Sequence, residues 1–127
     1  MTNKMNTAAD RDRRQRNGQV RGRDLYWGFT LGILSNLATI FMLHSSVGTM
    51  GWAMTAMIVG TFIFVMINSF DCMDDLKANA DDMDEEEAAT NFGNKFSNAP
   101  WGMFKGVVTL IFGALALTQL QVIWDIF

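Results

Sequence analysis

Three long runs of uncharged, mainly apolar residues constrain this chain more than any other feature. They cover residues 25–43, 50–70 and 101–124, and their only charge is Lys105, near the start of the third run. A helix needs about twenty mainly apolar residues to cross roughly 30 Å of hydrocarbon. Each run meets that length, so the sequence predicts an all-α integral membrane protein with three transmembrane helices.

The distribution of charge separates this prediction from the alternative, a soluble bundle of three buried helices. Residues 1–24 hold seven of the ten basic residues, and residues 71–100 hold nine of the thirteen acidic ones. Confining charge to two segments is typical of a membrane protein. We therefore predict a flexible basic arm over 1–24, and a three-helix membrane domain over 25–127 that contains an acidic segment, 71–100.

The basic arm also predicts orientation and binding partners. Lys and Arg next to a first transmembrane helix favour the cytoplasm, so we expect the N-terminus inside and the C-terminus outside. The arginines suit anionic lipid, or nucleic-acid phosphates if the chain is viral. They also suit the acidic segment, within or between protomers. These residues are Arg11, Arg13, Arg14, Arg16, Arg21 and Arg23.

The tryptophans agree with three membrane crossings, because all four lie at ends of the apolar runs. Tryptophan is enriched at both membrane–water interfaces. With the N-terminus inside, Trp27 and Trp101 belong to the inner interface, and Trp52 and Trp124 belong to the outer one.

Pairs of small residues four positions apart occur in each run. Such pairs let helix backbones approach closely in lipid. We expect them to pack the three helices together, with an oligomer interface as the alternative. The pairs are Gly28 and Gly32, Ala56 and Gly60, and Gly102 and Gly106.

Four amide side chains lie within the runs or near their ends: Asn36, Asn68, Gln119 and Gln121. An amide in lipid seeks a partner on another helix. We expect these residues to join helices, with a polar lining for a transport pathway as the alternative. No Asp, Glu, Arg or His lies in the middle of a run to carry protons or ions.

The acidic segment is expected to be a cytoplasmic, amphipathic extension of the second helix. Met73, Leu76, Ala80 and Met83 recur at spacings of three and four, as on one helix face. The helix should fray near Glu87, and residues 89–100 should form a loop. We expect Met73, Leu76 and Met83 to be a docking surface for a partner.

Groups that carry out chemistry are few. Cys72 and His44 are the only residues of their types, and the acidic segment lacks the central glycine of a calcium-binding loop. A catalytic triad and a phosphate-binding glycine loop are also absent from the sequence. We therefore expect no enzyme activity, no metal and no cofactor.

These observations predict a structural or accessory subunit of a larger membrane assembly, with protein partners or further copies of itself. The three-span plan, with its short outer link at residues 44–49, resembles the small accessory subunits of bacterial terminal oxidases. That resemblance implies a respiratory-type complex in a bacterial inner membrane. A membrane-containing virion, with its internal membrane, is the other setting. The alternatives are a holin-like pore-forming lysis protein and a small channel or transporter subunit.

Overall fold

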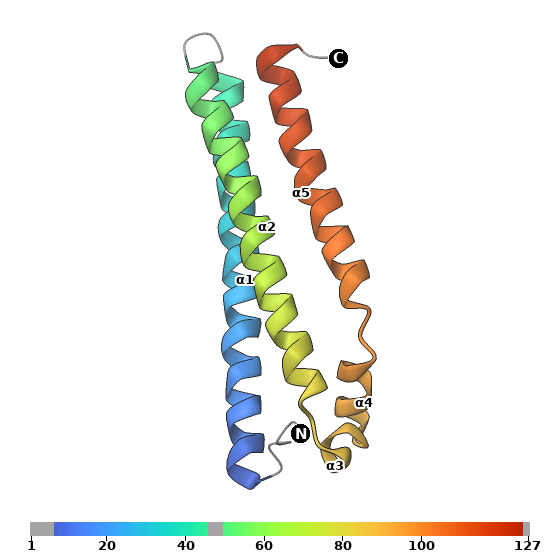
Figure 1. Cartoon of the computed structure of the whole chain (residues 1–127). Coiled ribbons are helices and arrows are strands. Elements are labelled where there is room, and N and C mark those ends of the chain that lie inside the picture. The colour runs from blue at the N-terminus through green and yellow to red at the C-terminus, as the bar shows by residue number, and fades with distance from the viewer. Residues whose placement is uncertain (1–6, 46–49, 126–127) are drawn as a thin grey trace.

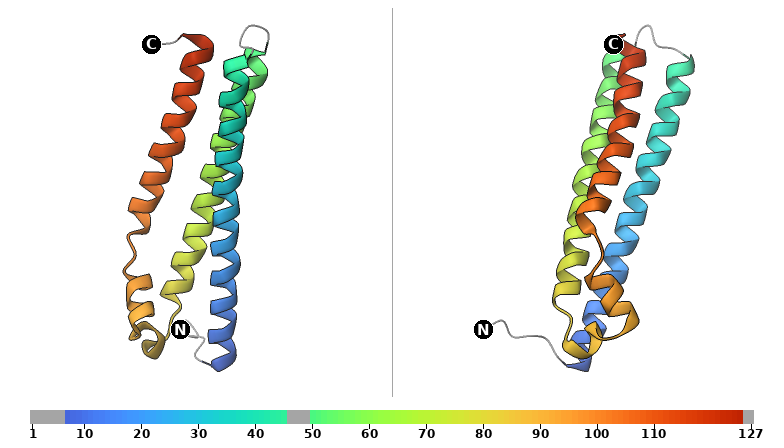
Figure 2. Two further views of the ribbon diagram at one scale, coloured as in Figure 1. Left: turned by 180° about the vertical axis from the view of Figure 1, so that it is seen from behind. Right: turned by 90° about the vertical axis from the view of Figure 1, so that its right-hand side faces the viewer.

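The computed structural model describes residues 7–45 and 50–125, and 90% of these described residues lie in helices, with no strand among them. Three long helices lie side by side, and successive ones run in opposite directions; two short helices lie at the end of the bundle where the first long helix begins (Figures 1 and 2). The helices are α1 (Ala8–Ser45), α2 (Gly51–Asp81), α3 (Glu85–Ala88), α4 (Asn91–Ser97) and α5 (Trp101–Trp124).

The three long helices are each long and apolar enough to cross a membrane. Most of their apolar surface faces outward: only 17%, 22% and 11% of the most apolar stretches of α1, α2 and α5 are buried in the protein. Phe41 and Leu110, for example, are 73% and 72% exposed. Apolar surface of this extent requires an apolar surrounding, which agrees with a multi-pass membrane protein.

The small interior is centred on α2. Val65, completely buried, packs with Met73 of the same helix and with Val108 and Phe112 of α5. Phe29 of α1 stacks on Phe112, with their ring centroids 6.2 Å apart. The core therefore joins all three long helices.

The basic arm differs from its prediction as a flexible segment, because residues 8–24 belong to α1. Thr7 begins the helix with a reciprocal cap: its backbone N–H donates to Asp10 Oδ2, and its Oγ1 accepts the Asp10 N–H, both at 3.2 Å. Such a cap satisfies backbone donors that a helix start leaves unpaired. The arm is also held by contacts with other helices, described below. Residues 1–6 lie outside the described residues.

The acidic segment also differs from its prediction as one helix reaching Glu87. α2 ends at Asp81, and Asp84 begins the separate helix α3 by accepting the Glu87 N–H at 2.9 Å. Aspartate is among the best residues for this N-cap position. The chain therefore turns at residues 82–84, which the apolar spacing alone did not indicate.

The expected loop over 89–100 contains α4. Thr90 caps this helix by accepting the Gly93 N–H at 3.0 Å. A Cβ atom at Gly93 would lie 2.0 Å from the Glu87 carbonyl oxygen, so only glycine fits there. Here the glycine permits a close backbone approach between α3 and α4, and it does not mark a turn.

Candidate functional site

Basic and acidic segments that are far apart in sequence meet at one end of the bundle. We call this end the charged head, and define it as residues 8–24 of α1 and 71–81 of α2, with the link at 82–84, α3 and α4. Asn79 of α2 fixes the register of the two long helices by donating to the Arg14 carbonyl oxygen at 3.0 Å. The pairing of arm and acidic segment, one of three roles considered for the arm, thus occurs within a single chain.

The first group of ion pairs joins α1 to the start of α3. Arg11 Nε lies 2.7 Å from Asp84 Oδ2, and Arg11 Nη2 lies 2.7 Å from Glu86 Oε2. Arg14 binds Glu87 and lies 3.7 Å from Asp84. The side chains of Arg14 and Asp84 are 6% and 7% exposed, so their interaction is shielded from water.

A second group of ion pairs lies closer to the apolar part of the bundle. Arg21 of α1 binds Asp75 of α2 at 2.5 Å and approaches Asp71 at 3.7 Å. Lys105 of α5 binds Asp74 of α2 at 2.6 Å. The ion pairs of this second group link α2 to α1 and to α5, so the acidic residues of α2 connect all three long helices just beyond their apolar stretches.

Asp84 has two roles that both favour its ionised form. The hydrogen bond from the Glu87 backbone N–H lowers the pKa of the Asp84 carboxyl, and the hydrogen bond from Arg11 lowers this pKa further. Burial acts in the opposite direction and is the weaker influence overall. The head is therefore assembled with Asp84 charged at neutral pH.

The other predicted phosphate-binding arginines lie on the outside of α1. Arg13, Arg16 and Arg23 are exposed, and Arg16 pairs with Asp12 one turn away at 2.6 Å. The arm is thus divided by the helix: Arg11, Arg14 and Arg21 face the acidic residues of the same chain.

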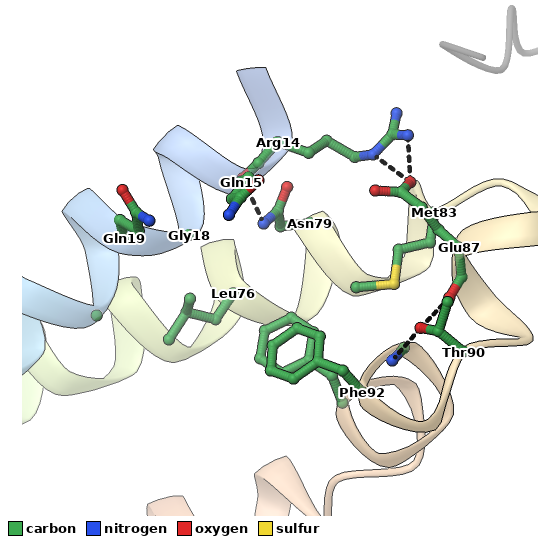
Figure 3. A pocket seen from close by; sticks show the side chains of 13 residues that line it. Arg14, Gln15, Gly18, Gln19, Leu76, Asn79, Met83, Glu87, Thr90 and Phe92 are labelled. Atoms are coloured by element: carbon green, nitrogen blue, oxygen red, sulfur yellow. Dashed lines mark hydrogen bonds and ion pairs between the residues drawn. The ribbon is translucent and has the colours of Figure 1, made fainter. Parts of the chain in front are cut away.

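A cavity of about 580 Å³ lies in the head between α1, the end of α2 and α4. Leu76, Met83 and Phe92 gather around it, with Arg14 and Glu87 at one end (Figure 3). Gly18 and Gly22 of α1 supply backbone in place of side chains on the opposite wall. The sequence does not predict this cavity, because the cavity depends on α4 and on the helical state of the arm.

The docking surface predicted at Met73, Leu76 and Met83 is mostly covered by other helices of the same chain. The prediction that these side chains are open to a partner is therefore corrected. Met73 is 4% exposed and belongs to the core, and Leu76 is 8% exposed and lines the cavity. Met83 is half-buried and also lines the cavity. These three side chains therefore pack against α1, α4 and α5 of the same molecule.

The three small-residue pairs have different surroundings. Gly28 and Gly32 lie where helices touch: a Cβ at Gly28 would lie 1.9 Å from Asn68 Nδ2, and a Cβ at Gly32 would lie 2.5 Å from Val65 Cγ2. Gly28 and Gly32 therefore lie at contacts inside the bundle. A Cβ at Gly60 of α2 would meet nothing within 4 Å.

A Cβ at Gly102 or at Gly106 of α5 would also meet nothing within 4 Å, and Ala56 is exposed beside Gly60. The sequence predicts that these two pairs pack inside the bundle, but they make no such contact within the described part of the chain. They lie on the outer surfaces of α2 and α5. The three helices can enclose only part of their combined surface, and these faces are the ones that remain open.

Two of the predicted amide contacts join helices. Gln119 of α5 donates to Asn36 Oδ1 of α1 at 2.6 Å, and Asn36 donates to the Gly32 carbonyl oxygen at 2.8 Å. Asn68 of α2 donates to the Asp24 carbonyl oxygen of α1 at 3.4 Å. For Gln121 the structure gives a half-buried position near the end of α5.

Trp52, Trp101 and Trp124 lie near ends of the long helices, whereas Trp27 lies near the middle of α1 because this helix also includes the basic arm. One predicted pair is in contact. Trp52 and Trp124 have ring centroids 4.7 Å apart, and Trp124 Nε1 donates to Thr55 Oγ1 at 2.8 Å. Trp101 packs against the core at the other end of the bundle, and Trp27 is 57% exposed. The two ends of the bundle thus carry different aromatic arrangements.

Within residues 7–45 and 50–125, no three His, Cys, Asp or Glu side chains are placed to hold a metal ion together. The chain matches no known protein family, and neither a curated protein nor a solved structure shows significant similarity to it. Its function must therefore be inferred from its own geometry.

Proposed function

We propose that this protein is a non-enzymatic, multi-pass membrane protein that serves as a structural or accessory subunit of a larger assembly. The observation that carries the proposal is the pair of open small-residue faces, Ala56 and Gly60 on α2 and Gly102 and Gly106 on α5. Small residues at this spacing allow a further helix to approach closely in lipid. In this chain Gly28 and Gly32 already serve the internal contact.

The surface beside Gly60 adds support. A groove of about 380 Å³ runs along the outside of the bundle between α1 and α2, and its walls include Leu31, Met57, Gly60 and Phe64. Its apolar walls and its missing Cβ suit a transmembrane helix of another subunit. The charged head supports the same function differently: its internal ion pairs hold the helices in register without a partner.

In this proposal the N-terminus and the basic arm lie in the cytoplasm, the side of the membrane on which Lys and Arg are enriched. The exposed Arg13, Arg16 and Arg23 suit the anionic headgroups of that leaflet, at about 1 kcal/mol each near the surface. A bacterial inner membrane provides such headgroups, and so does the internal membrane of a virion.

Mild detergent extraction followed by mass measurement tests the proposal. We expect complexes heavier than the 14.2 kDa monomer, with either a different subunit or further copies of this chain. The double variant Ala56→Leu, Gly60→Leu should release the monomer, because the leucines hold a neighbouring helix away. Ala114→Leu is the matched control, since Ala114 is exposed on α5 and belongs neither to these pairs nor to the walls of the groove.

A monomer under every mild condition would contradict the proposal. Induced expression gives a second outcome: harmless accumulation in the membrane agrees with a structural subunit. Abrupt permeabilisation of the cells would favour the holin-like alternative, and altered ion flux in Asn36 or Gln119 variants would favour a channel or transporter subunit.

A further inference from the structure

The cavity in the charged head has the size and the lining of a ligand site. Ligand pockets typically measure about 300–1,000 Å³, with mostly apolar walls and a few polar groups. This cavity measures about 580 Å³, and Leu76, Met83, Phe92 and Phe96 supply apolar surface. A Cβ at Gly22 would meet nothing within 4 Å, so the space beside the α1 backbone is open.

The charges at the cavity indicate a neutral ligand. Arg14 and Glu87 both line it, and they bind each other. A carboxylate or an ammonium group on a ligand would have to displace one member of this pair, and breaking a shielded ion pair is strongly unfavourable. Gln15, Gln19 and Asn79 instead offer amide groups that bond to uncharged hydroxyl or carbonyl groups.

A row of aromatic side chains joins the cavity to the apolar part of the bundle. Phe92 stacks on Phe96, with ring centroids 5.7 Å apart. Phe96 and Trp101 meet edge-on with centroids 5.3 Å apart, and Trp101 and Phe104 meet edge-on with centroids 6.1 Å apart. Phe92 is 72% exposed, and Phe104 lies on the first turn of α5. This row provides continuous apolar contact between the cavity and the apolar stretch of α5.

From these three observations we infer that the cavity binds a neutral amphiphile taken from the membrane. One acyl chain fills the apolar space beside Gly22, and an uncharged, hydroxyl-bearing head bonds to the amides of Gln15, Gln19 and Asn79. A monoacylglycerol has this chemistry. The inference rests on the head alone, so it stands or falls separately from the proposed subunit function.

Photolabelling with a monoacylglycerol that carries a diazirine in its acyl chain tests the inference. The full chain is placed in phosphatidylcholine nanodiscs, irradiated, and mapped by mass spectrometry. We expect labels on Phe92, Phe96 and Met83. Gly22→Leu should abolish these labels, because the leucine side chain enters the open space, where its Cβ meets no neighbouring atom within 4 Å. Ala114→Leu, a change at an exposed position of α5 that lies outside the cavity lining and outside the small-residue pairs, should keep them.

A fatty acid with the same diazirine chain tests the neutral head, and we expect several-fold weaker labelling of α4. The exposed residues Gln15 and Gln19 give a second test that does not disturb packing: the double leucine variant should lower monoacylglycerol labelling several-fold. Labels confined to the apolar stretches, equal labels in Gly22→Leu, or stronger labels from the fatty acid would each overturn the inference.

Discussion

Arg14 is the residue on which the charged head depends most. It is 5% exposed, it binds Glu87, and its carbonyl oxygen accepts a hydrogen bond from Asn79. Its side chain crosses from α1 to α3, so one residue connects two helices that are distant in sequence. An isolated charge in such a place is unfavourable, whereas a paired charge is tolerated.

Replacing Arg14 by leucine should therefore destabilise the head by about 3 kcal/mol, because Glu87 and Asp84 lose their buried cation. Hydrogen–deuterium exchange of residues 85–97 should rise. Arg13→Leu, at the exposed neighbouring position, should change stability by less than about 0.5 kcal/mol. Equal exchange in the two variants would show that Arg14 does not hold the head together.

Asp84 makes the head sensitive to acid. Its pKa in the folded protein lies below the unfolded value of about 3.9. A lowered folded pKa contributes stability that is fully present above the unfolded value and is lost as pH falls through the folded pKa. The head should therefore loosen only below about pH 4.

Exchange measured on α3 between neutral pH and pH 3 checks this expectation. Asp84→Asn should remove most of the acid-dependent change, because asparagine still caps the helix but has no charge to lose. If Asp84→Asn loosened with acid as much as the original protein, another group would be responsible.

At the scale of elements, the bundle depends on one close contact between helices. Gly32 of α1 faces both other long helices: an added Cβ would lie 2.5 Å from Val65 Cγ2 of α2 and 2.9 Å from Phe112 Cε1 of α5. Both neighbours belong to the core, so neither can move without disturbing the packing of the other.

Gly32→Ala should thus lower the stability of the bundle by about 1–3 kcal/mol, the usual range for overpacking. Thermal unfolding in detergent measures this change. Gly106→Ala is the matched control: it makes the same change at an open position of α5, and it should leave stability unchanged or slightly raised. The prediction fails if both variants melt together.

The helices that the sequence predicts well are those defined by long uncharged runs, because length and apolarity alone require them. The helix over residues 8–24 is not predictable from its own sequence, because its order depends on partners elsewhere in the chain, such as Asp84 and Asn79. Two local signals did exist. Asp84 followed three residues later by Glu87 is a capping-box pattern that indicates the start of α3, and Thr90 is a residue type favoured at the N-cap of a helix such as α4.

The candidate site was less accessible to prediction. Which arginines face the acidic residues depends on the rotation of α1 about its axis, and Gly28 packing on α2 sets that rotation. The contact between Gln119 and Asn36 likewise depends on the relative heights of α1 and α5. These are properties of the assembled bundle, and single-segment periodicity contains no information on them.

At the scale of the whole molecule, the ion pairs require the arm and the acidic segment to lie on one side of the membrane. Asp12 and Glu85 are both exposed in the head. If the N-terminus is cytoplasmic, as proposed, Asp12→Cys and Glu85→Cys should react with an impermeant maleimide only after cells are opened. A cysteine at Asp125, past the end of α5, should react in intact cells.

The single native cysteine provides the background for this measurement. Cys72 is 1% exposed, so it should react slowly in folded protein and needs no replacement. Labelling of Asp125→Cys only in opened cells, together with labelling of the head variants in intact cells, would reverse the orientation. Labels on opposite sides for the two head positions would contradict the ion-paired head itself.

The length of α1 has a mechanical consequence. Its 38 residues form one helix of about 57 Å, roughly twice the 30 Å thickness of bilayer hydrocarbon. Residues 8–24 of this helix therefore project beyond the hydrocarbon, and they move when the helix tilts. A change in bilayer thickness alters helix tilt, and a tilt of about 10° moves the tip of this segment by roughly 4 Å. Because Arg11 and Arg14 bind the acidic residues of α3 and its N-cap, that motion would displace α3 parallel to the plane of the membrane.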